Sequence, residues 1–154
     1  MRRQGERHGG PGVREAHPVA DQAVDRRRRN VFNTRLNARL NGVRLTVARG
    51  DLFAPVVDGL FDAIVASPPC LPEACARLLG RGGNAPGGPD GRAVLDAICR
   101  EAHDHLWPGG SLFLVQSGLA DIARTVRDLG SSGLAVDVVA TQTIPLPAAL
   151  LAFE

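Results

Sequence analysis

The sequence contains no lysine, and all 18 of its basic side chains are arginine. Opposed by 16 acidic residues, they leave a net charge of +2, which argues neither for nor against a nucleic-acid partner. The missing lysine is typical of a GC-rich genome and carries no mechanism. Long apolar runs are also absent: no stretch approaches the roughly 20 residues that a membrane-spanning helix needs. We therefore expect no membrane-embedded segment.

Cysteine is scarce, with three residues at Cys70, Cys75 and Cys99. An odd number argues against a disulfide framework, and the basic N-terminus lacks the apolar stretch of a signal peptide. We expect a reduced, cytoplasmic protein. A zinc site is not expected either, because His103 and His105 are two residues apart on a helix and do not share a face.

The length of 154 residues and the 44% hydrophobic content fit one globular domain. Residues 1–20 are polar, rich in Gly, Arg and His, and without periodicity. We expect this segment to be disordered or poorly packed. The domain itself is expected over residues 21–154.

Strand-like and helix-like patterns alternate through this domain. Strands are expected at 22–25, 43–47, 60–66, 111–116 and 134–143. Helices are expected at 28–41 with an apolar face of Phe32, Leu36 and Leu40, at 91–106 with Asp90 as N-cap, and at 119–129. Residues 79–91 are expected to form a loop, and 108–110 a turn. The continuous apolar run at 60–66 is typical of a strand covered on both faces.

Such alternation indicates an α/β fold with a parallel sheet and helices on both faces. Ligands of these sheets bind at the carboxyl ends of the strands. Three segments mark those ends here: Asp25, Asp51 with Leu52, and Ser67-Pro68-Pro69-Cys70.

The segment FDAIVASPPC at residues 61–70 resembles the FDxIVxNPPY motif of class I S-adenosylmethionine-dependent methyltransferases of the HemK/PrmC type. Known members methylate the side-chain amide of a release-factor glutamine. Residues 33–43 and 88–117 resemble further segments of this family, and the similarity covers roughly residues 23–146. The resemblance implies a Rossmann-like fold, S-adenosyl-L-methionine as cofactor, and a protein (release-factor-like) or nucleic-acid substrate.

The same resemblance implies roles for the strand ends. Asp25 would bind the ribose hydroxyls of the cofactor, and Asp51 with Leu52 its adenine end. The catalytic corner would be Ser67, Pro68, Pro69 and Cys70. In it, the Ser67 hydroxyl and the Pro68 carbonyl would accept hydrogen bonds from the NH2 group that receives the methyl.

The sequence also departs from the family pattern. Ser67 stands where the family has asparagine, and Cys70 where it has an aromatic residue. A glycine-rich loop should precede Asp25 by about 20 residues, and residues 8–12 (HGGPG) do not match it. We therefore expect an incomplete sheet that lacks the first central strand and glycine-rich loop of the family, and its last strand.

Two other functions stay open. A catalytically inactive remnant of such an enzyme would follow from the missing loop. A small nucleic-acid-binding module would use residues 26–29 (RRRR), although arginines at a helix N-terminus oppose its dipole and are expected to be merely solvated. The oligomeric state is left open.

Overall fold

The computed structural model describes residues 21–56, 59–80 and 87–145. Residues 1–20, including the glycines at 8–12, lie outside the described residues. The described helices and strands alternate in the order β1 (Gln22–Asp25), α1 (Arg28–Leu40), β2 (Thr46–Arg49), β3 (Phe61–Ala66), α2 (Glu73–Leu78), α3 (Ala93–Glu101), η1 (Ala102–His105), β4 (Leu106–Leu114), η2 (Gly118–Ala120) and α4 (Ile122–Ser131). In these ranges no helix has both the length and the apolar character to cross a membrane.

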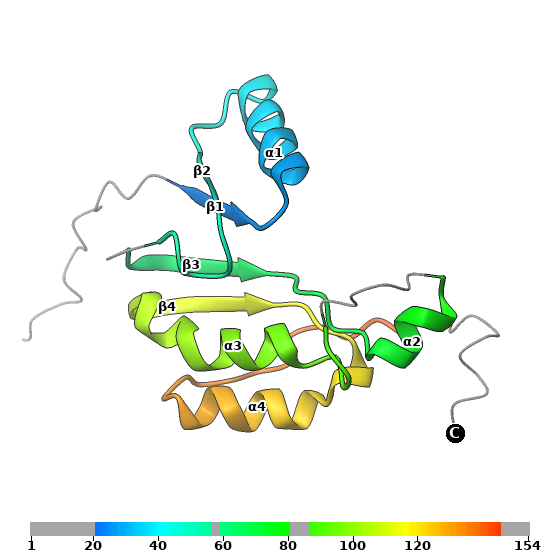
Figure 1. Cartoon of the computed structure of the whole chain (residues 1–154). Coiled ribbons are helices and arrows are strands. Elements are labelled where there is room, and N and C mark those ends of the chain that lie inside the picture. The colour runs from blue at the N-terminus through cyan, green and yellow to red at the C-terminus, as the bar shows by residue number, and fades with distance from the viewer. Residues whose placement is uncertain (1–20, 57–58, 81–86, 146–154) are drawn as a thin grey trace, which may run out of the picture.

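The strands form two parallel pairs, β1 with β2 and β3 with β4 (Figure 1). Within the described chain, no ladder joins the two pairs. The expected α/β fold of parallel strands flanked by helices is confirmed, and it is present as two short sheets rather than one.

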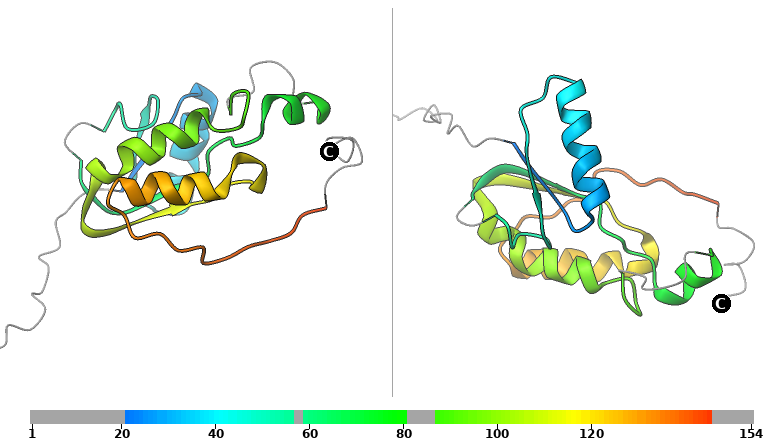
Figure 2. Two further views of the ribbon diagram at one scale, coloured as in Figure 1. Left: turned by 90° about the horizontal axis from the view of Figure 1, so that it is seen from below. Right: turned by 45° about the horizontal axis from the view of Figure 1, so that its top comes forward.

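The main hydrophobic core lies between β3–β4 and two helices. Figure 2 shows α3 and α4 side by side against the strands. Their buried side chains include Leu95, Ile98 and Leu129. Burial of each such side chain contributes roughly 1.5–3 kcal/mol.

The other face of the β3–β4 pair is open. Val65, Phe113 and Val115 are each more than half exposed. The expectation that the strand at 60–66 is covered on both faces is therefore wrong for the described residues. Its apolar run is continuous, but α3 and α4 both lie on one side of it.

Helix α1 agrees closely with the expected range, but its expected apolar face is wrong. Val31 is buried, whereas Phe32 and Leu40 are 65% and 73% exposed and Leu36 is 43% exposed. The helix contacts β1 and β2, and Val31 lies one position, about 100° around the helix, from Phe32. Tertiary packing thus selects a different face from the one with the most regular apolar spacing.

The end of α1 explains why β2 begins three residues later than expected. The Gly42 N–H donates to the Arg39 carbonyl (3.3 Å) and the Val43 N–H donates to the Ala38 carbonyl (2.9 Å). Gly42 has a φ of +67°, and these two bonds make a Schellman motif. Because Val43 is tied to the helix, the ladder with β1 starts at Thr46.

Strand β4 begins earlier than expected, at Leu106 instead of residue 111. The expected turn at 108–110 is a bulge within it: Phe61 pairs with Leu106, but Ala63 already pairs with Ser111. A Cβ on Gly110 would lie 2.9 Å from the Phe61 carbonyl oxygen, so the bulge requires glycine there. The preceding helix α3 ends at Glu101 and not near residue 106.

Three further expectations differ from the structure. Asp90 is not the N-cap of α3; its carboxylate accepts the Arg92 N–H (3.0 Å), and the helix begins at Ala93. Helix α2 was not expected. Residues 134–143 form no strand, because no described strand pairs with them, and Val139 is exposed.

Candidate cofactor and acceptor site

The carboxyl ends of β1 and β2 meet side by side. Asp25 is in register with Arg49, and the Gly50 N–H donates to the Asp25 carbonyl (3.2 Å). The Asp25 carboxylate is held in place, since it accepts from the Arg27 N–H (2.7 Å) and the Asn30 side-chain amide (3.0 Å). A carboxylate has about four acceptor positions, so further positions stay available to a ligand.

Asp51 follows β2 and lies in a tight turn. Its side chain is exposed and lies 3.6 Å from the Arg26 guanidinium. A Cβ on Gly50 would meet the Pro55 ring at 2.6 Å, so the turn closes only over glycine. The next residue, Leu52, has a φ of +46°, a conformation that non-glycine residues rarely adopt. Such strained residues cluster at ligand sites.

Two open hollows adjoin Asp51. One of about 340 Å³ is lined by Arg26, Arg49, Gly50 and Asp51. The other, of about 460 Å³, is lined by Asp51, Leu52, Phe53, Ala54, Ala97, Glu101 and His105. Within it, the Phe53 and His105 rings are stacked with their centroids 4.4 Å apart.

The Ser67–Cys70 corner follows β3 and is held from the side of β4. The Val115 N–H donates to the Ala66 carbonyl (3.0 Å), which keeps the two strands together to their ends. Just beyond, the Ser117 N–H donates to the Cys70 Sγ (3.1 Å). The Cys70 side chain therefore supports the corner from within instead of presenting a flat surface to a ligand.

The corner is also held by the loop before α3. A Cβ on Gly87 would lie 2.6 Å from the Leu71 carbonyl oxygen, and one on Gly91 would lie 2.8 Å from the Cys70 carbonyl oxygen. The Glu73 N–H donates to the Gly88 carbonyl (3.0 Å). The glycines thus permit backbone-to-backbone contact between the two segments.

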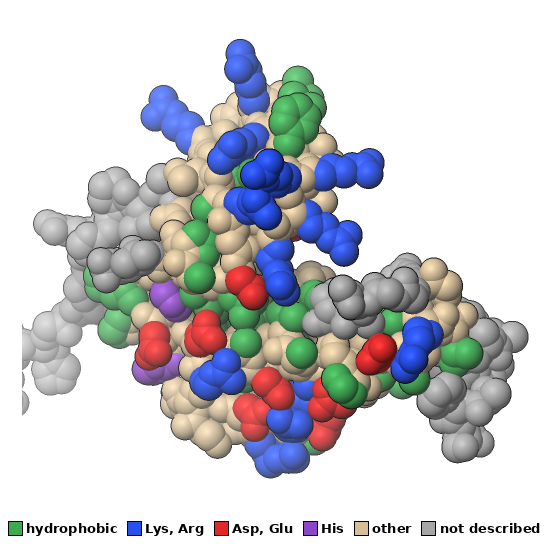
Figure 3. Space-filling model, in the orientation of Figure 1, with side chains coloured by type: hydrophobic (Ala, Val, Ile, Leu, Met, Phe, Trp, Pro, Cys, Tyr) green, Lys and Arg blue, Asp and Glu red, His purple; other side chains and the backbone are tan. Residues whose placement is uncertain are grey.

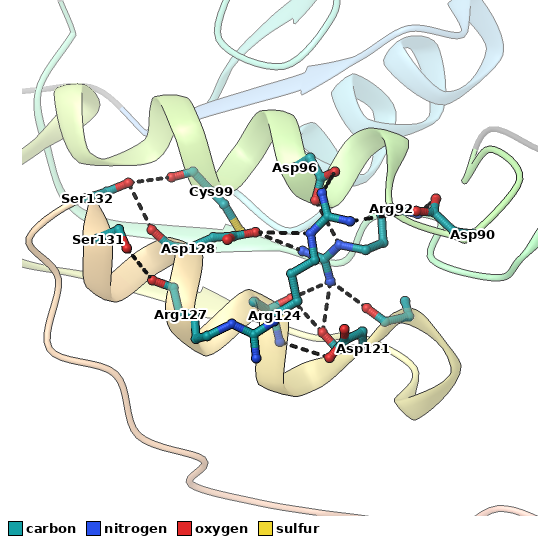
Figure 4. A network of polar contacts seen from close by, with 12 residues as sticks. Asp90, Arg92, Asp96, Cys99, Asp121, Arg124, Arg127, Asp128, Ser131 and Ser132 are labelled. Atoms are coloured by element: carbon teal, nitrogen blue, oxygen red, sulfur yellow. Dashed lines mark hydrogen bonds and ion pairs between the residues drawn. The ribbon is translucent and has the colours of Figure 1, made fainter.

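Arg92 anchors this loop to the start of α4 (Figure 4). Its side chain is only 3% exposed. The Nη1 atom donates to the Ala120 and Asp121 carbonyls (2.5 and 2.9 Å) and to the Thr125 hydroxyl (3.0 Å). The charge is balanced by two carboxylates, Asp96 at 2.8 Å and Asp128 at 3.4 Å.

The network also extends toward Cys99. Burial raises the pKa of the Cys99 thiol, with the positive charge of Arg92 acting in the opposite direction. This agrees with the small core residue that the sequence indicates, because an inert, neutral thiol packs as an apolar group.

A buried amide lies at the end of β4, directly before Ser117. The Nε2 and Oε1 atoms of Gln116 are both buried and have no hydrogen-bond partner among the described residues. An unpaired buried polar group costs about 1–3 kcal/mol. It is therefore an exception that calls for a partner or a role.

The structure brings the site residues of the sequence analysis together in two groups. Asp25, Asp51 and Leu52 lie together at the ends of β1 and β2. The Ser67–Cys70 corner lies at the end of β3, and Figure 1 shows the arrowheads of β1, β3 and β4 pointing the same way. No hydrogen bond or ion pair joins the two groups within the described residues.

Three residues of this site were missed from the sequence: Arg92, Gln116 and Ser117. Their roles depend on contacts with segments far away in the chain; Cys70 and Ser117, for example, are 47 positions apart. The only available signal was the position of Gln116 and Ser117 after an apolar strand.

Comparison with known proteins gives relatives of one kind. A protein from Methanocaldococcus jannaschii named protein N5-glutamine methyltransferase is 34% identical over 111 residues, which are 71% of this chain and 56% of that protein. The release factor glutamine methyltransferase of Mycobacterium tuberculosis is 34% identical over 130 residues, covering 81% of this chain and 41% of that protein. The chain thus spans about half the length of the curated relatives it matches. No protein-family model matches it.

The fold has a counterpart among solved structures. The crystal structure of a methyltransferase from Pyrococcus furiosus superposes with a TM-score of 0.59 at 22% identity, covering 79% of this chain and 58% of that one. At this identity the likeness concerns the fold alone. Sequence and fold agree, and the chain is a relative of the class I methyltransferases that modify protein glutamine.

Proposed function

We propose that this chain acts in the transfer of a methyl group from S-adenosylmethionine to the side-chain amide nitrogen of a protein glutamine. One observation carries the proposal. Carboxylates follow β1 and β2, a Ser-Pro-Pro corner follows β3, and the arrowheads of β1 and β3 point the same way (Figure 1). The names of the relatives support glutamine as the acceptor.

The two carboxylates fit the polar parts of this cofactor. Asp25 is fixed by its own chain and keeps acceptor positions for two ribose hydroxyls. Asp51 is exposed between two hollows and can accept from an adenine amino group, with Leu52 beside it. When bound, the cofactor supplies an electrophilic methyl group on a sulfonium sulfur.

The corner fits a primary amide. An amide nitrogen is a weak nucleophile because its lone pair is delocalised, so its orientation matters. Within the described residues, the Ser67 hydroxyl and the Pro68 carbonyl have no hydrogen-bond partner, and both can accept from an NH2 group. The proline rings restrict φ, so the carbonyl direction is set before the substrate arrives.

The contribution expected from the corner is orientation, a term that reaches about 7–11 kcal/mol in well-aligned systems. The surplus proton of the amide leaves to solvent after the transfer. A nucleobase amino group presents the same two N–H bonds, but the names of the relatives favour a protein substrate of the release-factor type. A cytoplasmic location belongs to this proposal and is supported by three cysteines that form no disulfide.

Methyl transfer to a glutamine-containing peptide from isotopically labelled S-adenosylmethionine tests the proposal. We expect Ser67→Ala to lower the transfer rate about tenfold, because one acceptor of the amide is lost. Ser67→Asn, which supplies another acceptor, should retain activity. Ser111→Ala, on an exposed position of β4, is the control and should change nothing. Equal rates for all four proteins would contradict the assigned role of Ser67.

A second candidate is favoured by the separation of the two strand pairs. If the chain binds no cofactor, it is a non-catalytic relative, and no labelled methyl group reaches any peptide. The two candidates are distinguished by the wild-type protein alone, since only the first gives a measurable transfer rate.

A further inference from the structure

Charge is divided unevenly between two halves of the described chain. Residues 21–51, here called the basic lobe, carry eight arginines and three aspartates, a formal charge of +5. The other described residues carry five arginines and nine carboxylates, a formal charge of −4. Figure 3 shows basic side chains concentrated over α1, and most acidic side chains over the half that contains α3 and α4. The low net charge of the sequence conceals this separation.

Most arginines of the basic lobe are not used to hold the fold. Arg26 contacts Asp51 at 3.6 Å, Arg35 donates to the Val47 carbonyl (2.7 Å) and Arg49 to the Arg26 carbonyl (3.2 Å). The other five side chains are exposed and make no ion pair or hydrogen bond to any described residue: Arg27, Arg28, Arg29, Arg39 and Arg44. These guanidinium groups are available to an anionic partner.

An exposed aromatic ring lies among them. Phe32 is 65% exposed on α1. Residues three or four positions apart are neighbours on a helix surface. Phe32 is therefore flanked by Arg28 and Arg29 in the preceding turn and by Arg35 in the next turn. Nucleic-acid-binding surfaces combine an aromatic platform for a base with cationic groups for the flanking phosphates.

The start of α1 is unfavourable in the absence of a ligand. No side chain caps the helix, and its first turn holds no acidic residue. Consecutive arginines at this end oppose the helix dipole and repel one another. Bound phosphates would offset both effects. Phosphate binding would thus explain the consecutive arginines at the start of α1, which solvation alone does not.

We propose that the basic lobe binds single-stranded nucleic acid, with a base stacked on Phe32 and phosphates on the five exposed arginines, among them Arg28, Arg29 and Arg39. A single strand is favoured over a duplex because stacking on a side chain requires an unpaired base. A nucleic acid is favoured over an acidic protein because a base can stack on the exposed Phe32 ring, whereas acidic side chains have no ring to stack. The inference is independent of methyl transfer.

Fluorescence anisotropy of the full chain with a labelled single-stranded RNA of about 12 nucleotides tests this. If five arginines contact phosphates, the logarithm of the binding constant should fall with that of salt concentration at a slope of roughly −3.5. The triple variant Arg28→Gln, Arg29→Gln and Arg39→Gln should reduce this slope to roughly −1.4. Phe32→Leu should weaken binding about tenfold with an unchanged slope.

The control carries the same charge change outside the basic lobe: Arg77→Gln, Arg100→Gln and Arg127→Gln. It should bind RNA like the wild type, and circular dichroism should show that both triple variants are folded. Equal weakening by the two triple variants would overturn the proposal, because net charge alone would then explain binding. Tighter binding of a duplex, or of polyglutamate, would overturn it as well.

Discussion

The backbone N–H of Ser117 donates a hydrogen bond to the Sγ atom of Cys70 over 3.1 Å. This contact joins the segment after β4 to the Ser-Pro-Pro-Cys corner after β3. The position that carries an aromatic residue in the HemK/PrmC-type motif therefore holds a side chain that braces the backbone. In the proposed function, a bound acceptor would meet the hydroxyl and carbonyl of the corner without a stacking ring.

Replacement of Cys70 tests this brace. Cys70→Ala removes the acceptor and leaves the Ser117 N–H unpaired, so the free energy of unfolding should fall by about 1–2 kcal/mol. Cys70→Ser keeps an acceptor and should lose less. Urea denaturation measures both. If alanine and serine destabilise the protein equally, the hydrogen bond does not contribute.

Arg92 should be among the most sensitive residues of the fold. Its side chain is 3% exposed and balances Asp96 and Asp128. Arg92→Met leaves the Ala120 and Asp121 carbonyls and the Thr125 hydroxyl without their buried donor, so unfolding should become easier by about 1–3 kcal/mol. The two carboxylates keep a partner, because Arg124 lies 2.7 Å from Asp96 and 3.6 Å from Asp128. Arg100→Met provides the comparison, because the exposed pair of Arg100 with Glu101 contributes at most about 1 kcal/mol. A small, equal loss for both variants in urea denaturation would refute the anchoring role of Arg92.

Replacement of Gln116 should stabilise the fold, in contrast to replacement of Arg92. Met has nearly the shape of Gln but no polar atoms that need partners. Gln116→Met is expected to raise the free energy of unfolding by about 1–3 kcal/mol, since two unpaired buried atoms disappear. The exposed Gln142→Met should stay within about 0.5 kcal/mol of the wild type. Destabilisation by Gln116→Met would show that its amide is paired in solution.

Local patterns predicted the elements whose boundaries depend on neighbouring residues. The helix over 28–40 and the strand over 61–66 follow from apolar spacing and from the prolines at 68 and 69. The start of β2 was missed because the end of α1 captures the Val43 N–H. The start of β4 was missed because a bulge with glycines resembles a turn.

Packing between distant segments was beyond the sequence. Nothing local shows that α1 turns Phe32 outward, or that residues 134–143 have no partner strand among the described residues. The site residues likewise differ in whether the sequence alone reveals them. Acids and a Ser-Pro-Pro motif after strands are visible in the sequence, whereas Arg92 acquires its role only when α4 packs on α3.

Calorimetric titration with S-adenosylmethionine tests the central claim, that carboxylates at the ends of β1 and β2 hold the cofactor. We expect the wild type to bind, Asp25→Asn to bind at least tenfold more weakly, and Asp21→Asn to bind like the wild type. The control is matched, because Asp21 lies just before the opposite end of β1 and its replacement changes the charge equally. A flat trace for the wild type at millimolar cofactor, or equal weakening by both variants, would contradict the account.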